Sequence, residues 1–143
     1  MKIVLCHGTF DLLHIGHMRM FERAAELGDR LIVTLTADKF VSKGPGRPIY
    51  NEEERAYAIR RLRGVAQVEI CYEKTGLAMI HRHQPAFYVK GGDYRVADKH
   101  GSLDMERAVV ESYGGKLVLL DGPQWSSTSI IERVAQWKEA QAA

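Results

Sequence analysis

Short apolar runs alternate with amphipathic stretches along the chain, and this alternation constrains the fold more than any other feature. The apolar runs have strand length, and Arg30–Thr36 is continuous enough for a strand that is buried on both faces. The expected strands are Lys2–Cys6, Arg30–Thr36, Val65–Cys71, Phe87–Lys90 and Lys116–Leu120. The expected helices are His17–Leu27, Asn51 to about Arg63, Leu77–His83, Leu103–Tyr113 and Ser126 to about Ala140. Strands that alternate with helices pair in parallel, so the sequence predicts an α/β fold: a five-stranded parallel sheet with helices on both faces.

Length and charge narrow the class of protein further. At 143 residues we expect one domain, residues 1–143, either complete or as one domain of a longer polypeptide. The 20 lysines and arginines nearly balance the 18 aspartates and glutamates, and the net charge of +2 argues against a nucleic-acid or membrane-surface partner. No apolar stretch approaches the roughly 18 residues of a membrane helix, and the apolar start is interrupted too early for a signal peptide. We therefore expect a cytoplasmic protein whose two cysteines, Cys6 and Cys71, are reduced core residues.

The most informative motif, His14-Ile15-Gly16-His17, follows the first expected strand. Residues three apart share a helix face, so both imidazoles can point at one ligand. Gly16 between them leaves room for that ligand to approach the backbone. A helix amino terminus also offers unpaired N–H groups and a positive dipole end, which favour a phosphate. Read alone, two histidines at this position are also typical of ordinary polar surface, and it is the clusters elsewhere in the chain that favour a phosphate site.

Those further polar clusters follow the ends of the expected strands, which is where parallel sheets bind ligands. They are Gly8-Thr9-Phe10-Asp11, Lys43-Gly44-Pro45-Gly46-Arg47, Arg55 with Arg63 on one helix face, Gly91-Gly92-Asp93-Tyr94 and Ser126-Ser127-Thr128-Ser129. Each has a simpler interpretation when read alone: a solvated loop, an ordinary turn or a helix cap. Together they supply cations, imidazoles, hydroxyls and glycines. That inventory suits displacement at phosphorus, in which an enzyme positions the reactants and stabilises charge.

The same segments resemble the cytidylyltransferase-like nucleotidyltransferases. The resemblance rests on the run from Gly8 to His17, Lys43-Gly44, Glu54-Arg55, Leu62-Arg63, Val89-Lys90-Gly91-Gly92-Asp93-Tyr94 and Ser126-Ser127-Thr128, in the family's order. The His-x-Gly-His element also looks like class I aminoacyl-tRNA synthetases, but this chain has no Lys-Met-Ser-Lys-Ser loop and is too short for a tRNA-binding domain. The resemblance implies a single Rossmann-like domain, which in this family commonly forms a homodimer.

The resemblance also implies a reaction. A phosphate oxygen of an acceptor attacks the α-phosphorus of a nucleoside triphosphate, and pyrophosphate leaves with the assistance of Mg²⁺, without protein metal ligands. By position, His14 and His17 would stabilise the pentavalent phosphorus, while Lys43 would hold the acceptor's phosphate or bridge it to the triphosphate. Asp11 and Arg55 are expected beside Lys43 at the acceptor. The residues expected at the nucleotide are Gly8, Thr9, Phe10, Gly16, Arg63, Gly91, Asp93, and Ser127 and Thr128 at its β- and γ-phosphates.

The substrates stay open at this point. Transfer of CMP from CTP to a small phosphate- or phosphonate-bearing acceptor is the main hypothesis. Glycerol-phosphate cytidylyltransferases, however, have Arg-Thr-Glu-Gly-Ile before the Ser-Thr run, whereas Asp121–Trp125 stands here and lacks that arginine. Val89–Tyr94 and Ser126–Ile131 are more similar to heptose 1-phosphate nucleotidyltransferases, some of which use ATP. The alternative is therefore an ATP-dependent adenylyltransferase for a sugar phosphate. A nucleotide-binding module without catalysis is a third hypothesis, which the intact histidine motif disfavours.

Overall fold

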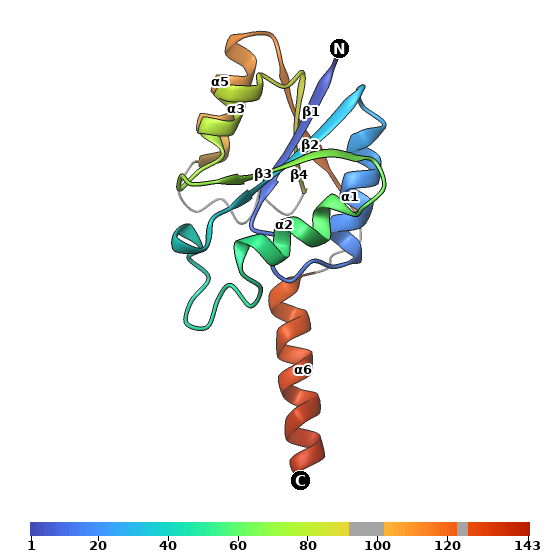
Figure 1. Cartoon of the computed structure of the whole chain (residues 1–143), viewed down its shortest axis with the longest axis vertical. Helices are drawn as coiled ribbons and strands as arrows, with labels where there is room; N and C mark the ends of the chain where they lie inside the picture. The colour runs from blue at the N-terminus through green and yellow to red at the C-terminus, as the bar shows by residue number, and fades with distance from the viewer. Residues whose placement is uncertain (92–101, 123–125) are drawn as a thin grey trace.

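The computed structural model describes residues 1–91, 102–122 and 126–143 and contains the predicted parallel sheet. Its strands are β1 (Ile3–Gly8), β2 (Arg30–Thr36), β3 (Val65–Cys71), β4 (Phe87–Gly91) and β5 (Lys116–Leu120). They lie in the order β3-β2-β1-β4-β5, and each neighbouring pair is parallel. The central strand is β1, in which Leu5 pairs with Ile32 on one side and Tyr88 on the other (Figure 1).

Helices cover both faces of the sheet, as predicted (Figure 1). One core contains Val4 and Cys6 of β1 and packs against α1 (Ile15–Ala25) and α2 (Glu52–Arg60). The other contains Leu5 of β1 and packs against α3 (Leu77–His83) and α5 (Ser102–Ser112). Successive side chains of a strand point to opposite faces, so β1 is buried on both sides and its apolar run is explained. Both cysteines are buried and free.

The strand order reverses beside β1, because the chain first moves outward to β2 and β3 and then returns to β4 on the other side. In parallel α/β sheets, such a reversal leaves a crevice at the carboxyl ends of the two strands that flank it. Here those ends are Gly8 of β1 and Gly91 of β4. The topology therefore places a ligand site beside the histidine motif.

Several helix boundaries differ by one to three residues from the predicted ones, and two of these differences bear on the predicted site. Helix α1 begins at Ile15 rather than His17, because the side chain of His14 caps it and the helix starts at the next residue. Helix α2 ends at Arg60, before Arg63, because the N–H of Arg61 turns back to the carbonyls of Ala58 and Ile59. Arg63 thus lies outside the helix that carries Arg55, and the predicted shared helix face is wrong.

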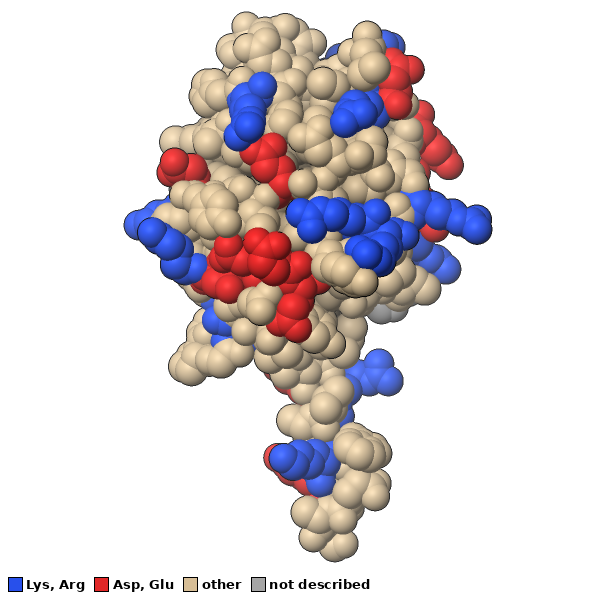
Figure 2. Space-filling view, in the orientation of Figure 1, with Lys and Arg blue, Asp and Glu red and all other residues tan. Residues whose placement is uncertain are grey.

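The last helix, α6 (Ser127–Ala142), projects from the body of the molecule (Figure 1). Ser127 is its one buried residue, and Val134 and Trp137 are largely exposed. On the face shown in Figure 2, acidic side chains gather over the start of α2, whose first turn carries Glu52, Glu53 and Glu54, and basic side chains lie toward its other end. This face therefore carries both signs of charge. Among the described residues, no helix has the length and apolar character needed to cross a bilayer.

Candidate active site

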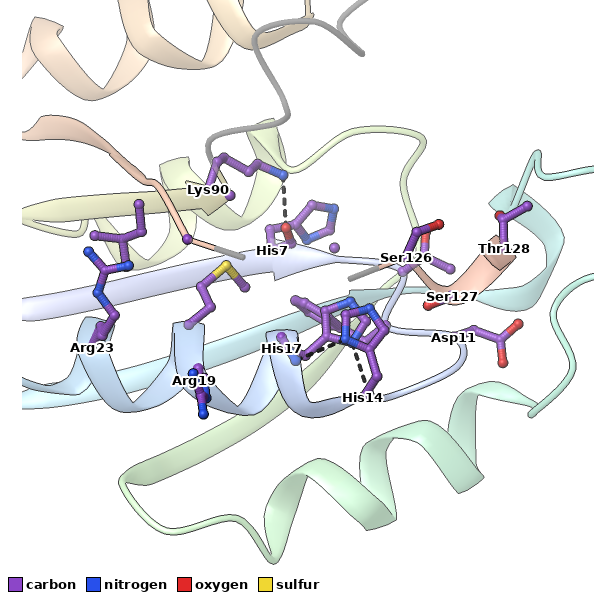
Figure 3. A pocket seen from close by; sticks show the side chains of 18 of the residues that line it. His7, Asp11, His14, His17, Arg19, Arg23, Lys90, Ser126, Ser127 and Thr128 are labelled. Carbon is purple, nitrogen blue, oxygen red and sulfur yellow. Dashed lines mark hydrogen bonds between the residues drawn. The ribbon is translucent and has the colours of Figure 1, made fainter. Parts of the chain in front are cut away.

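A cavity of about 550 Å³ lies at the reversal point of the sheet, within the usual range of about 300–1,000 Å³ for ligand pockets (Figure 3). Its walls come from the β1–α1 loop, the first turns of α1, the end of β4 and the start of α6. Most of the predicted site residues meet here. They are Gly8, Thr9, Phe10, Asp11, His14, Gly16, His17, Lys43, Gly91, Ser127 and Thr128.

The two imidazoles are stacked at the start of α1, with ring centroids 3.7 Å apart and an interplanar angle of 20° (Figure 3). His14 is the N-cap residue, and its Nδ1 accepts a hydrogen bond from the N–H of Gly16 at 3.0 Å. The N–H of His14 in turn donates to Nδ1 of His17 at 3.2 Å. Each ring thus binds the helix start through Nδ1, and its orientation is fixed before any ligand arrives.

These hydrogen bonds also fix the chemistry of the rings. A ring whose Nδ1 accepts a hydrogen bond carries its proton on Nε2, so each neutral imidazole is a donor through Nε2. Burial lowers the pKa of His17 to about 3, with further lowering by His14 and Lys43. His17 is therefore neutral at pH 7, and the pair offers two oriented N–H donors.

Phe10 supports this arrangement from the core side. Its ring meets His17 edge-on at 5.2 Å between centroids and packs on Phe21 of the core. Phe10 has a φ of 55°, a left-handed conformation that non-glycine residues adopt rarely and often at functional sites. A side chain at Gly8 would place its Cβ 2.9 Å from the Phe10 ring, so glycine is required there for packing, apart from any contact with a nucleotide.

The start of α6 closes the cavity from the carboxyl-terminal part of the chain. The hydroxyl of Ser127 is buried and donates to the carbonyl of Leu12 at 2.6 Å. Ser126 is the N-cap, and its side chain accepts from the N–H of Ser129. Thr128 is exposed and faces the cavity (Figure 3). The hydroxyl run thus combines a cap, an anchor and an accessible hydroxyl at a helix amino terminus.

Asp11 lines the cavity, but its carboxylate forms hydrogen bonds with the loop that contains Arg47, Ile49 and Tyr50. It accepts hydrogen bonds from the N–H groups of Ile49 and Tyr50 at 2.6 and 3.1 Å, and Arg47 pairs with it at 3.2 Å. Arg47 also donates to the Asp11 carbonyl. Asp11 is 1% exposed, so it holds the segment that follows Lys43 against the histidine loop. The contact between Asp11 and an acceptor stays a prediction.

Arg55 also has a defined structural place. Its guanidinium donates to the carbonyls of Thr9 and Thr36 at 2.9 and 2.7 Å, and to that of Tyr50 at 3.0 Å. It also pairs with Asp38 at 2.6 Å. Arg55 is 2% exposed and ties the ends of β1 and β2 to α2. It does not line the cavity, and neither does the exposed Arg63. Their roles in acceptor and nucleotide binding stay predictions.

Sequence reasoning assigned no role to Lys90 or His7, which the structure brings to the same cavity (Figure 3). Lys90 is 3% exposed, and its Nζ donates to the His7 carbonyl at 2.8 Å. His7 is 2.8 Å from the Thr34 hydroxyl through Nδ1, and burial lowers its pKa to about 3, with a smaller effect of Lys90. A lysine at the end of the otherwise apolar run Phe87–Lys90 is the signal that could have revealed this position.

Gly92, Asp93, Tyr94 and Trp125 lie outside the described residues. The described residues contain no group of three or more His, Cys, Asp and Glu side chains that could hold a metal ion. The cavity offers mainly cations, imidazoles and hydroxyls. That donor set fits a Mg²⁺ ion held chiefly by triphosphate oxygens, as is usual for this metal.

Comparison with known proteins agrees with this geometry. A family model described as "Cytidylyltransferase-like" matches residues 5–133. The chain is 44% identical over 137 residues to the bifunctional protein HldE of Gluconobacter oxydans (strain 621H) and 42% identical over 141 residues to that of Geotalea uraniireducens (strain Rf4). These alignments cover 94% and 93% of this chain but 28% and 27% of the relatives. The chain therefore spans about a quarter of the length of these curated relatives.

Solved structures share the fold. A lipopolysaccharide core biosynthesis protein from Thermoplasma volcanium is 22% identical, with a TM-score of 0.67 over 88% of this chain and 99% of that protein. A pantothenate synthetase from Thermus thermophilus is 14% identical, with a TM-score of 0.64 over 91% of this chain and 61% of that protein. The family match takes in the β1–α1 loop, both histidines and the start of α6. This chain belongs to the cytidylyltransferase-like family of nucleotidyltransferases.

Proposed function

We propose that this nucleotidyltransferase is an adenylyltransferase, which transfers AMP from ATP to a sugar phosphate such as heptose 1-phosphate and releases pyrophosphate. The observation that carries the chemistry is the stacked His14–His17 pair. Its two oriented Nε2–H donors lie in one cavity with the cation of Lys43 and the amino terminus of α6. Neutral donors and cations of this kind stabilise the negative charge that develops on phosphate oxygens during displacement.

The reaction needs no covalent intermediate with the protein. A phosphate oxygen of the acceptor forms a bond to the α-phosphorus, and the bond from that phosphorus to the bridging oxygen breaks. The electron pair of the broken bond leaves with pyrophosphate. His14 and His17 donate hydrogen bonds to the α- and β-phosphate oxygens, and Thr128 and the α6 amino terminus receive the leaving group. Mg²⁺, when bound with the triphosphate, neutralises charge on the leaving pyrophosphate.

The nucleotide and acceptor follow from the relatives rather than from the cavity. The family model alone is equally compatible with CTP, which is the main sequence-based hypothesis. The curated relatives favour the alternative, because bifunctional HldE proteins are among those that match more than nine tenths of this chain. The resemblance of Val89–Tyr94 and Ser126–Ile131 to heptose 1-phosphate nucleotidyltransferases points the same way.

The test crosses four nucleoside triphosphates with phosphate esters, phosphonates and sugar 1-phosphates, including heptose 1-phosphate, and measures pyrophosphate release with Mg²⁺. We expect turnover with ATP and a sugar 1-phosphate. The shift in Tm with ATP should exceed that with CTP, since at equal concentration the ligand that binds the folded protein more tightly stabilises it more. A clear preference for CTP would restore the cytidylyl hypothesis. Tight nucleotide binding with no pyrophosphate release from any pair would favour a non-catalytic module.

A further inference from the structure

A second, smaller cavity of about 230 Å³ lies beside the first. The two cavities share a wall made of His7, Gly8, Thr9, Lys43 and Lys90. The histidine pair and the start of α6 line only the larger one. The smaller one continues past the shared wall toward the end of β3 and the start of α5. A molecule in the smaller cavity would thus reach the reacting phosphorus across Lys43 and Lys90.

The smaller cavity is lined by basic side chains at the shared wall and by an acidic side chain at α5. Lys43 and Lys90 stand at the shared wall, and Lys74 adds a third ammonium group. Glu106 of α5 lines only the smaller cavity, and it is the one carboxylate among the described residues that line it. Ammonium groups attract a phosphate, whereas a carboxylate repels it and accepts hydrogen bonds from hydroxyl groups. The cavity therefore suits a molecule with a phosphate at one end and hydroxyls at the other.

Glu106 is the residue that the fold itself leaves unexplained. It is 4% exposed, and its Oε2 is buried with no hydrogen-bond partner within the described ranges. A buried carboxylate oxygen without a partner costs free energy, and native structures pair nearly all such groups. A side chain that lines a cavity and lacks a protein partner for a buried oxygen is arranged for a donor supplied by a ligand.

Gly76 lines the smaller cavity and packs closely against protein atoms. A side chain at Gly76 would place its Cβ 2.8 Å from the Tyr88 hydroxyl and 2.9 Å from the His7 ring. Thr75, next to it, adds a hydroxyl to the lining. Polar groups therefore stand on the β3 side as well as on the α5 side, as a polyhydroxylated ligand requires.

We infer that the smaller cavity is the acceptor subsite and that Glu106 recognises sugar hydroxyls in it. The inference rests on the proposed function, since it assigns the acceptor of that reaction to this cavity. The acceptor's phosphate lies at Lys43 and Lys90, next to the triphosphate, and its sugar ring extends toward Glu106 and Thr75. Glu106 is thereby a specificity-determining residue that separates sugar phosphates from small phosphate esters and phosphonates.

The test compares Glu106→Gln with Glu111→Gln, an exposed residue of the same helix. Because a hydrogen bond to a charged group is stronger than a neutral one, Glu106→Gln should raise KM for the sugar 1-phosphate about 10-fold or more. KM for ATP should stay within about 2-fold. In thermal shift without nucleotide, stabilisation by the sugar 1-phosphate should fall in Glu106→Gln, while any shift with inorganic phosphate should match the wild type. Glu111→Gln should behave as the wild type throughout.

A purely structural Glu106 gives a different pattern. Removing an unpartnered buried charge should leave the Tm of the free protein unchanged or raised, whereas removing a structural hydrogen-bonding group should lower it. A lowered Tm together with an unchanged sugar-phosphate shift would overturn the inference, as would an equal rise of both KM values. If the wild type binds sugar phosphates through Glu106 yet releases no pyrophosphate, the proposed function fails and the subsite stands. If turnover occurs but is indifferent to Glu106, the subsite fails alone.

Discussion

At the residue scale, the site depends on two imidazoles that are held as neutral donors rather than as cations. Nδ1 of each ring is used at the start of α1, and burial keeps the pKa of His17 near 3. An imidazolium carries an N–H group on both nitrogens, so Nδ1 could no longer accept a hydrogen bond after protonation. The same contacts that orient the rings therefore also set their protonation state.

This arrangement predicts a large catalytic effect with little structural effect. His17→Ala removes one donor to the reacting phosphates and should lower kcat about 100-fold or more. His14→Asn should lower kcat similarly, because asparagine keeps the N-cap acceptor but lacks Nε2–H at that position. Pyrophosphate release measures both rates, and circular dichroism checks the fold. His81→Ala, at an exposed position of α3, is the control. Wild-type turnover in His17→Ala would show that His17 does not donate to the reacting phosphates in the transition state.

Residue types alone did not reveal which polar side chains form hydrogen bonds within the protein rather than with a ligand. Asp11 and Arg55 have the chemistry of acceptor ligands, yet both are buried among protein hydrogen-bond partners. Those partners come from segments distant in sequence, and local spacing carries no information about them. Conversely, the placement of His14 beside His17 could be predicted, because it follows from their local spacing of three positions.

At the element scale, Arg55 ties α2 to the ends of β1 and β2 through carbonyl groups. Arg55→Met should lower the free energy of unfolding by about 3–5 kcal/mol, because it leaves buried carbonyls without their donor. Denaturant titration measures this change. Arg60→Met, exposed on the same helix, should change stability little. Full stability of Arg55→Met together with a raised acceptor KM would instead support the predicted acceptor contact.

At the start of α6, Ser127 anchors the helix to the protein, whereas its neighbour Thr128 faces the cavity. Ser127→Ala removes the hydrogen bond to Leu12 and should cost about 1 kcal/mol, or about 3 °C in Tm. Thr128→Val should leave Tm unchanged and raise KM for ATP, since Thr128 is exposed and faces the cavity. Ser129→Ala, at an exposed position in the same turn, is the control for both measurements. A fall in Tm with Thr128→Val would show that this hydroxyl is structural as well.

The elements themselves were largely predictable, because most strands are mainly apolar runs and β1 is buried on both faces. The order of the strands in the sheet was not predictable, because hydrophobic periodicity indicates which residues are buried but not which strands pair. The reversal beside β1, which creates the crevice, became visible only with the strand pairing. Helix ends were missed where a side chain sets them, as His14 does for α1.

At the scale of the whole molecule, the buried His7 and the half-buried His17, both neutral in the folded protein, predict sensitivity to acid. The pKa of His7 and of His17 falls from 6.5 to about 3 on folding, so below pH 6.5 the unfolded chain binds more protons than the folded one. Stability is therefore highest above pH 6.5 and falls as the pH is lowered toward 3. Each histidine contributes a slope of up to about 1.4 kcal/mol per pH unit.

Denaturant titrations at several values between pH 6.5 and about 5 measure this slope, in a range where carboxylates contribute little. His7→Asn should flatten it by about half, because His17 still contributes. His81→Asn, at an exposed site, should leave it unchanged. A slope that His7→Asn does not alter would mean that His7 is charged in the folded protein.

The hydrogen bond between Ser127 and Leu12 joins residues that are 115 positions apart. During synthesis the β1–α1 loop emerges well before the wall that faces it, because that wall begins only after β5. A nascent chain that stops after β5 contains every strand and both histidines but only part of the nucleotide cavity. Nucleotide affinity should therefore emerge late and abruptly as the chain lengthens, well after the sheet can form. Binding of ATP would then report that α6 has docked on the β1–α1 loop rather than that the core of the sheet has folded.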